Sequence, residues 1–386
     1  MSSIRQSIQR YFAPIQPLPA GNYHYQSPPD LLKPYRLHLR QDADGSGILI
    51  VNASTILHLN ATACEYAYHL VKGTPETEVA RTISSRYRIS RKISLQDFRD
   101  FSTRVHALID TPDLDPVTYL DFERQVPYSE GISAPYRLDC ALTYRLSPGT
   151  DQRAAPAERV KSELSTDQWK VILDKTWSVG IPHIIFTGGE ATLREDLLEL
   201  IKYTENNGQV SGLLTDGVRL AEPGYLDTLL QTGLDHLTLI FREGLENSWN
   251  TLDKLVAADI FLVVHNTINV HNAGEIPGLL SRLAEKGVQN VSLSARTPNL
   301  EEDLMKAREQ VAALDLSLVW DIPVPYSDLN PVALEVAPEH QPKGAGHAWL
   351  YVEPDGDVLP AQDIIRPLGN FLTDTWETIW QSARQD

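Results

Sequence analysis

The sequence predicts an α/β protein in which a large, mostly parallel sheet follows a smaller α+β unit. Between residues 136 and 322, apolar runs typical of strands alternate with helical runs of about ten to fifteen residues, an order that favours βα units. Between residues 34 and 111, strand-like runs come first and helical runs follow. Six βα repeats favour an open, partial (β/α)6 barrel, and a closed eightfold barrel is the structural alternative.

The composition fits a chain of two or three domains. It has 386 residues, of which 42% are hydrophobic, and no apolar run reaches the length of about eighteen residues that a membrane span needs. No signal peptide is visible at the N-terminus, so we expect a cytoplasmic protein with no membrane partner. The net charge of −17 argues against nucleic acid as a partner, and it is compatible with a basic or neutral peptide.

An arm and the strands of a small domain are expected first. Residues 1–33 are rich in Pro, Gln and Ser and are predicted to form an N-terminal arm. In the domain 34–111, alternating or continuous apolar runs predict strands at residues 35–40, 48–51 and 55–59.

Three helices are expected after these strands. Asn60 can cap a helix that runs to Val71, and Thr74-Pro75 opens a second helix toward Tyr87. Ser94 is expected to begin the third helix, because the apolar residues after it recur at helical spacing. Residues 112–135 then mix proline with aspartate and are predicted to be a linker.

The segment 136–322 opens with two strands. The first is Asp139–Tyr144 and the second is His183–Phe186, which Thr187-Gly188-Gly189-Glu190 follows directly. Between them, Ser165 is expected to cap a helix, with Gln168 as its capping-box partner. Further strands are expected at residues 210–214, 236–241, 260–264, 288–293 and 316–320.

The layout of these two strands and their loops resembles the opening of radical S-adenosylmethionine (SAM) enzymes. In that family, a CxxxCxxC loop after the first strand holds a four-iron four-sulfur cluster, and a GGE turn after the second contacts the amino group of SAM. The resemblance places the cluster-ligand positions at Leu146, Thr150 and Arg153. It implies that SAM would be contacted by Gly188, Gly189 and Glu190.

The cysteine count argues against a cluster. The chain has 2 cysteines, Cys64 and Cys140, whereas a cluster of this kind needs three thiolates. Starting the motif at Cys140 selects Tyr144 and Ser147 as the other positions, which are not thiolates. We therefore expect no iron–sulfur cluster and no radical chemistry. We also expect weak SAM binding at most, because in the family the amine and carboxylate of SAM chelate the cluster's unique iron.

Residues 323–386 resemble a degenerate form of the SPASM extension of peptide-modifying radical SAM enzymes. Two strands around Pro354-Asp355-Gly356 predict a hairpin, and Trp376–Trp380 follows near the end. In the family, a cysteine that ligates an auxiliary cluster commonly follows the hairpin, and Ala361 stands at that position here. No auxiliary cluster is expected either.

The unit 34–111 resembles the RiPP recognition element, a PqqD-like winged-helix (α+β) domain that binds leader peptides of ribosomally made, modified peptides. The resemblance rests on the run Ile50–Ala63, on Lys72-Gly73 and on the helices. It implies a peptide-binding edge at Thr55, Ile56 and Leu57, with a groove wall formed by Phe98, Phe101 and Val105. A winged helix used only for packing is the alternative. A DNA-binding one is disfavoured, because the third helix has no basic face.

The remaining polar residues carry weaker signals. Four histidines, His183, His236, His265 and His271, have no metal-ligand spacing and are interpreted as core or surface residues. The string Phe241-Arg242-Glu243 ends the fourth strand of the barrel, where charged residues can line a site. A single surface ion pair is the simpler interpretation.

These features favour a cluster-less, radical-SAM-like protein with no assigned catalytic residue or metal ligand. It would bind a ribosomal precursor peptide or leader, or scaffold a peptide-modifying partner such as an intact radical SAM paralogue. The alternative is an active SAM-dependent, peptide-modifying enzyme that uses a non-standard site. An engineered chain with its ligands removed is a third interpretation.

Overall fold

The chain forms two compact units, residues 1–125 (unit one) and 126–386 (unit two). The computed structural model describes residues 17–28, 31–53, 55–111, 132–150, 155–156, 158–245, 247–258, 260–319, 344–362 and 364–384. The division between the units falls within residues 112–135, the segment expected to be a linker. Across the described ranges, every helix is too short or too polar to cross a membrane.

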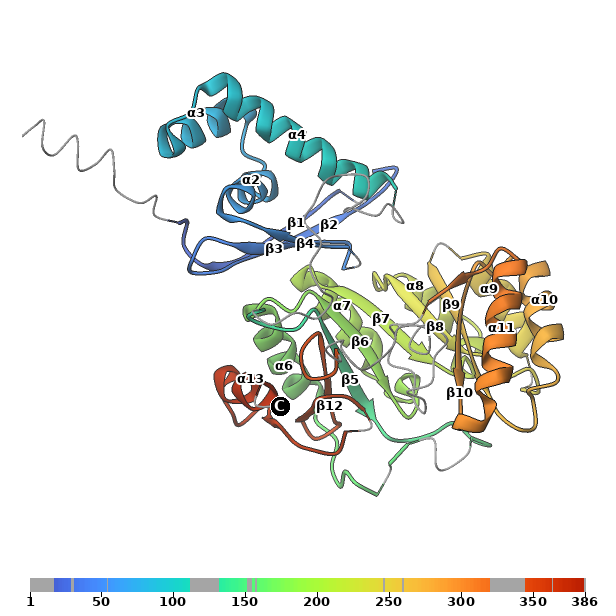
Figure 1. Ribbon diagram of the computed structural model, residues 1–386. Coiled ribbons are helices and arrows are strands. Elements are labelled where there is room, and N and C mark those ends of the chain that lie inside the picture. The colour runs from blue at the N-terminus through green and yellow to red at the C-terminus, as the bar shows by residue number, and fades with distance from the viewer. Residues whose placement is uncertain are drawn as a thin grey trace, which may run out of the picture. The chain divides into compact units, whose positions relative to one another are not determined.

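Unit one is an antiparallel sheet followed by three helices. The strands lie in chain order, β1 (Gly21–Gln26), β2 (Arg36–Gln41), β3 (Gly47–Val51) and β4 (Thr55–Leu59). The helices are α2 (Ala61–Val71), α3 (Glu76–Tyr87) and α4 (Arg91–Asp110). Helix α2 lies across the sheet, and α3 packs beside α4 (Figure 1). The strands and helices expected between residues 35 and 110 are thus present.

One face of this sheet and the inner faces of the helices form the core of unit one. Alternation along each strand directs every second side chain to that face. The buried residues that meet there include Leu37, Leu39, Leu49, Leu57, Leu59, Val79, Ile83, Phe98, Phe101 and Val105.

Two features of unit one differ from the sequence predictions. Residues 21–26 form β1, although residues 1–33 were expected to be an arm; the ring of Tyr23 packs edge-on against that of Tyr68, with centroids 4.9 Å apart. Helix α4 begins at Arg91 instead of Ser94, because the Ser90 side chain accepts a hydrogen bond from the Ile93 amide and caps the helix. The cap at Asn60 is confirmed.

Unit two contains a ten-stranded sheet with the order β11-β10-β9-β8-β7-β6-β5-β12-β13-β14. Neighbouring strands from β5 to β11 are parallel, and β12 also pairs parallel with β5. The bounds are β5 (Arg137–Thr143), β6 (His183–Gly188), β7 (Val210–Thr215), β8 (His236–Ile240), β9 (Phe261–Ile268), β10 (Asn290–Ala295), β11 (Ser317–Leu318), β12 (Trp349–Val352), β13 (Asp357–Leu359) and β14 (Gly369–Asn370).

Helices alternate with these strands along the chain, which Figure 1 colours from green to orange over this part. They are α6 (Thr166–Ser178), α7 (Leu197–Asn207), α8 (Tyr225–Leu230), α9 (Ser248–Val256), α10 (Ile276–Glu285) and α11 (Glu301–Ala313), with α13 (Trp376–Ala383) after the last strand. The capping box of Ser165 and Gln168 is confirmed at the start of α6. The predicted α/β class with a large parallel sheet is confirmed.

The two faces of the parallel sheet differ in polarity. Strand register places Cys140, Phe186 and Leu213 side by side on one face. The same register places Thr238 and Val263 on the other face, and two residues further along these strands it places His265 beside Ser292. The second face therefore carries the polar residues Thr238, His265 and Ser292.

The C-terminal hairpin is also confirmed. Strands β12 and β13 pair antiparallel, with Tyr351 opposite Leu359, and the turn between them contains Pro354-Asp355-Gly356. Because β12 pairs with β5, this hairpin extends the sheet beyond the first strand of unit two.

Candidate functional site

The glycine pair after β6 lies against the chain that leaves β5. The Gly189 amide donates to the carbonyl oxygen of Thr143 at 2.7 Å, and the next amide, of Glu190, donates to that of Arg145 at 2.8 Å. A Cβ atom at Gly188 would overlap the Thr143 carbonyl oxygen, and one at Gly189 would overlap that of Arg145. Gly188 also has φ of +127°, which side chains rarely allow. Backbone packing alone therefore requires both glycines.

The Glu190 carboxylate is buried and engaged by four donors. Its Oε1 accepts from the amide and hydroxyl of Thr192, at 3.1 and 2.6 Å, and from the Thr215 hydroxyl at 2.7 Å. Its Oε2 accepts from the Asp216 amide at 2.7 Å. Burial, followed by the charge of Asp216, raises the pKa of Glu190 to about 7. This side chain thus joins the turn after β6 to the end of β7.

A second polar contact joins β7, β8 and the loop after β5. The Arg242 Nη2 donates to Asp216 Oδ2 at 2.8 Å and to Thr150 Oγ1 at 3.1 Å. Arg242 therefore does not form a single surface pair with Glu243, which instead pairs with Arg282. Three adjacent parallel strands thus bring charged groups to their carboxyl ends, where open α/β sheets commonly bind ligands.

The positions expected to lack cluster ligands fall in three different surroundings. Leu146 packs against an apolar cluster that includes Tyr144 and Tyr351. Thr150 accepts the hydrogen bond from Arg242 described above, and Ala361 is half-buried after β13. Arg153 lies outside the described residues. Ala361 is not part of the apolar cluster that contains Leu146.

A buried polar cluster borders the Leu146 position. The Tyr144 hydroxyl donates to Glu353 Oε1 at 2.7 Å, and the Arg159 Nε donates to Glu353 Oε2 at 3.1 Å. Burial raises the pKa of Tyr144 far above its ordinary range. Glu353 also lies close to Asp355 and Asp357 in the hairpin turn. Because Glu353 is already neutralised by Arg159, this acidic group is interpreted as part of the hairpin's packing.

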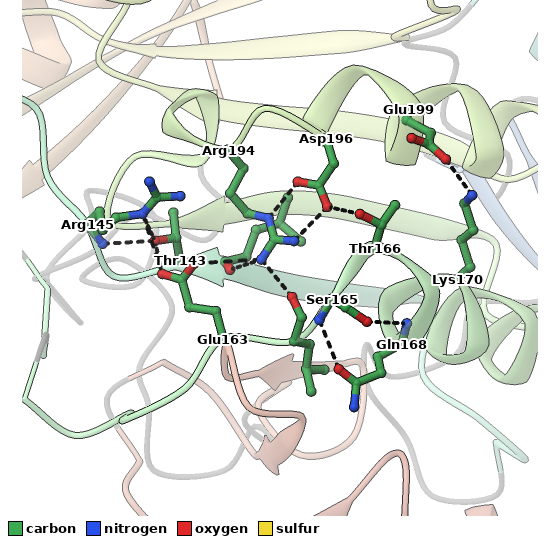
Figure 2. Close-up of polar contacts among 12 residues, drawn as sticks. Thr143, Arg145, Glu163, Ser165, Thr166, Gln168, Lys170, Arg194, Asp196 and Glu199 are labelled. Carbon is green, nitrogen blue, oxygen red and sulfur yellow. Dashed lines mark hydrogen bonds and ion pairs between the residues drawn. The ribbon is translucent and has the colours of Figure 1, made fainter.

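The Arg194 side chain forms hydrogen bonds to several chain segments near the glycine turn (Figure 2). Its Nε and Nη2 form a bidentate pair with Asp196, at 2.8 and 2.6 Å. Its Nη1 donates to the carbonyl oxygens of Leu142 and Leu164, at 3.2 and 3.0 Å. Glu163, which also accepts from the Thr143 hydroxyl, lies 3.7 Å from the same nitrogen. The network holds the end of β5 and the start of α6 in place.

Three of the four histidines considered from the sequence, His183, His236 and His265, make internal contacts. The Nε2 atoms of His183 and His236 lie 2.7 Å apart, and burial lowers the pKa of His236 to about 4. The His236 ring occupies the space that a side chain at Gly212 would need. His265 is fully buried among serine and threonine hydroxyls, and its pKa is lowered to about 3. His271 is exposed.

In unit one, β4 is an end strand of the sheet, as expected for a peptide-binding edge. The Asn52 amide bonds to the Arg36 carbonyl, so alternate residues of β3 face β2, and the others face β4. By the register between β3 and β4, Thr55 and Leu57 direct their backbone groups to β3, whereas Ile56 and His58 direct theirs outward. In the described chain, β4 has no strand neighbour on that outer side.

The residues expected to form the groove wall lie in the core of unit one. Phe98, Phe101 and Val105 are buried in the core of unit one, with Phe101 the most exposed of the three at 8%. Their helical spacing correctly indicates a buried stripe, but periodicity does not distinguish a core from a ligand groove. Thr55 and Ile56 are half-buried, and Leu57 is buried.

Sequence reasoning missed the polar partners that organise unit two. Arg194, Asp216 and Glu353 were not singled out as site residues from the sequence. Their partners are distant in the chain: Tyr144 and Glu353 are 209 positions apart. The single local signal was the pair Arg194 and Asp196 at i and i+2, right after the GGE turn.

Comparison with known proteins supports a relation to peptide-modifying enzymes. The chain is 30% identical over 229 residues to the PqqA peptide cyclase of Xanthomonas campestris pv. campestris strain B100, a match that covers 52% of this chain and 60% of that protein. It is 28% identical over 262 residues to the PqqA peptide cyclase of Methylobacterium nodulans, covering 59% and 67%. The chain thus spans about 60% of the length of the first curated relatives. No family model matches it.

Solved structures extend the comparison to the fold. SuiB of Streptococcus suis bound to its precursor peptide SuiA superposes with a TM-score of 0.60 at 13% identity, over 89% of this chain and 86% of that one. The SAM-bound form of SuiB gives a TM-score of 0.56 at 14% identity, over 92% and 88%. The likeness is one of fold: a mixed α/β chain with a large parallel sheet, similar to radical SAM enzyme folds.

Proposed function

We propose that this chain is a radical-SAM-like protein that binds a ribosomal precursor peptide or its leader and lacks the radical chemistry of its relatives. Unit one would be the PqqD-like, winged-helix recognition domain. Unit two would be a partial barrel followed by a degenerate SPASM-like region. The observation that carries the proposal is the outward edge of β4.

The β4 edge suits strand addition. Ile56 and His58 present their amide and carbonyl groups on the side where β4 has no neighbour in the described sheet. A free edge of this kind pairs readily with an extended chain, so proteins usually cover it or use it. A peptide that adds here gains main-chain hydrogen bonds, and its alternate side chains supply selectivity.

The buried aromatic core changes how selectivity would arise. Because Phe98 and Phe101 are already packed, they would support helix α4 from within the core without touching the peptide. The contacts to the peptide would fall to half-buried residues such as Thr55 and Ile56. Relatives agree with a peptide ligand: a PqqA peptide cyclase acts on a peptide, and SuiB was solved with a precursor peptide.

The absence of a cluster is supported by the surroundings of the ligand positions. Leu146 is packed in an apolar cluster, and the Thr150 hydroxyl is hydrogen bonded to Arg242, so neither position offers a thiolate. Both cysteines are buried, and burial raises the pKa of each thiol, that of Cys64 to about 12. Neither thiol is therefore disposed to ligate iron as a thiolate.

SAM binding would be weak at most. The glycines of the GGE turn are retained, but backbone packing accounts for them, and the Glu190 carboxylate is occupied by protein donors. Without iron, the amine and carboxylate of SAM lose their strongest anchor. We expect calorimetry to give a dissociation constant weaker than about 1 μM, or −8 kcal/mol; tighter binding would contradict this part of the proposal.

The peptide proposal is tested by panning a display library of random peptides on the full chain and on the chain without residues 35–110. Peptides enriched on the full chain should bind it and should lose binding to the deletion variant. Circular dichroism of the variant checks that unit two keeps its α/β fold. Equal enrichment of peptides on both proteins would indicate that the peptide site lies in unit two.

The rival function, an active SAM-dependent peptide-modifying enzyme with a non-standard site, has one observation in its favour. Charged groups from β7 and β8 meet at the carboxyl edge of the sheet, through Asp216 and Arg242. In a partner role, the chain would serve an intact radical SAM paralogue in the cytoplasm, without nucleic acid or membrane. The charged groups at this edge would then catalyse no reaction. Mass analysis of panned peptides after incubation with SAM separates the two functions.

A further inference from the structure

The sheet of unit one has a second face, on the side away from its helices. Alternation along β1 to β4 divides the side chains between the two faces, and the register between neighbouring strands determines which ones share a face. The face that meets the helices carries the leucines of the core. The second face carries the side chains of Asn22, His24, Gln26, Arg36, His38, Arg40, Ile48, Ile50, Ile56 and His58.

This second face is basic, although the chain as a whole is acidic. The ionisable side chains that the strands place on it are histidines and arginines, at positions 24, 36, 38, 40 and 58. The strands β1 to β4 contain no aspartate or glutamate, whereas the net charge of the whole chain is −17. A basic face of this kind favours an acidic partner by charge complementarity.

Two rows of side chains cross this face and end at β4. In the first row, register places Arg40 beside Ile48 and Ile48 beside His58, so the row ends in an imidazole. In the neighbouring row, Ile50 lies beside Ile56, so that row ends in an apolar side chain. The open edge of the sheet therefore presents one polar and one apolar side chain, two positions apart, on the same face.

The charge of Arg40 acts on His58. Burial, followed by the positive charge of Arg40, lowers the pKa of His58 below its ordinary 6.5. Arg40 is buried, but His58 is only half-buried, so a ligand at the edge would reach the imidazole. A carboxylate beside His58 would be attracted by the arginine and could accept a hydrogen bond from the ring.

A strand that adds to β4 places its side chains alternately on the two faces. The backbone groups of Ile56 and His58 point outward, and residues directly opposite each other on neighbouring strands share a face. The two ligand residues opposite Ile56 and His58 would thus project onto the basic face. The ligand residue between them would project onto the helix side, next to Leu57.

We propose that the peptide captured at the β4 edge carries an acidic residue opposite His58 and an apolar residue opposite Ile56. This inference rests on the proposed function, because it needs a strand to add at this edge, and it names the chemistry of that strand. An antiparallel ligand reads acidic-x-apolar from its N-terminus, and a parallel ligand reads apolar-x-acidic. Selectivity comes from the face away from the helices.

The peptides panned on the full chain test this pattern. Edge-dependent peptides are those that bind the full chain and fail to bind the Ile56→Pro variant, which lacks an outward N–H. We expect them to share an acidic and an apolar residue two positions apart. In a synthetic peptide of this set, exchange of the acid for its amide (Asp to Asn or Glu to Gln) should lower the affinity measured by calorimetry by about threefold or more.

A charge reversal assigns the preference to this face. The variant His58→Glu should bind the peptide with lysine at the acidic position better than the original peptide, the reverse of the wild-type order. His106→Glu is the matched control, because it makes the same change at an exposed position of α4, beside Tyr35, and should keep the wild-type order. Circular dichroism checks both folds. The peptide exchange on the wild-type chain stays decisive if the His58→Glu chain is unstable.

Three results would overturn the inference. Edge-dependent peptides could lack the acidic and apolar pattern, the exchange of acid for amide could change the affinity by less than about twofold, or a folded His58→Glu variant could keep the wild-type order. Each of these leaves peptide capture at β4 intact. If no panned peptide depends on residues 35–110, the proposed function fails together with this inference.

Discussion

Gly188 and Gly189 let two backbone segments approach closely after β5 and β6. We predict that Gly188→Ala and Gly189→Ala each lower the free energy of unfolding by on the order of 3 kcal/mol, because the new methyl group overlaps a carbonyl oxygen. Urea unfolding measures the loss. Gly244→Ala is the control, since a Cβ there meets open space, and its effect should stay within about 0.5 kcal/mol. Alanine variants as stable as the wild type would contradict the packing.

Glu190 links stability to pH. Its pKa in the folded chain is about 7, above the ordinary 4.5, so the folded state holds this proton more tightly than the unfolded state. The resulting stabilisation is fully present below about pH 4.5 and is lost as pH rises through 7, by about 3 kcal/mol in all. We predict that Glu190→Gln removes this slope from the unfolding free energy, whereas Glu195→Gln, at an exposed position, keeps it. Identical slopes in both variants would exclude Glu190 as the source.

At the scale of elements, proline substitutions at neighbouring positions of β4 can distinguish an effect on peptide binding from an effect on folding. Ile56→Pro deletes an outward N–H, and Leu57→Pro deletes one that bonds to β3. We expect the Ile56→Pro variant to keep the fold and to bind the panned peptides with an affinity lower by tenfold or more. A loss of this size corresponds to about one or two main-chain hydrogen bonds. Leu57→Pro should instead destabilise unit one, as circular dichroism would report. Full peptide binding by a folded Ile56→Pro variant would argue against strand addition.

Elements with local signals were predictable, and those that depend on distant partners were not. Asn60, and Ser165 with Gln168, signal helix starts because a cap needs only nearby amides. Strand β1 was missed because the prolines before and after Gly21–Gln26 suggested an arm, and its pairing with β2 is visible only in the fold. The bond from Arg242 to Thr150 joins residues 92 positions apart, so the candidate site in unit two had only its GGE turn as a signal.

For the whole molecule, the cysteine count makes a direct prediction about iron. Purified chain treated anaerobically with iron and sulfide should stay colourless after desalting, because its two buried thiols cannot supply three ligands. A ferredoxin reconstituted in parallel verifies the procedure. Visible absorption with stoichiometric iron would refute the cluster-less interpretation and favour the enzymatic rival.

The pairing of β12 with β5 sets the order in which unit two can be completed. Residues 349–352 fill the edge of a strand at residues 137–143, and Tyr144 finds its acceptor at Glu353. During synthesis, the βα units can form in succession, but one edge of β5 keeps unpaired backbone groups until more than two hundred further residues have left the ribosome. Such late, long-range closure slows folding and exposes an intermediate to aggregation. Expression at low temperature, or with chaperones, should therefore favour the folded chain over inclusion bodies.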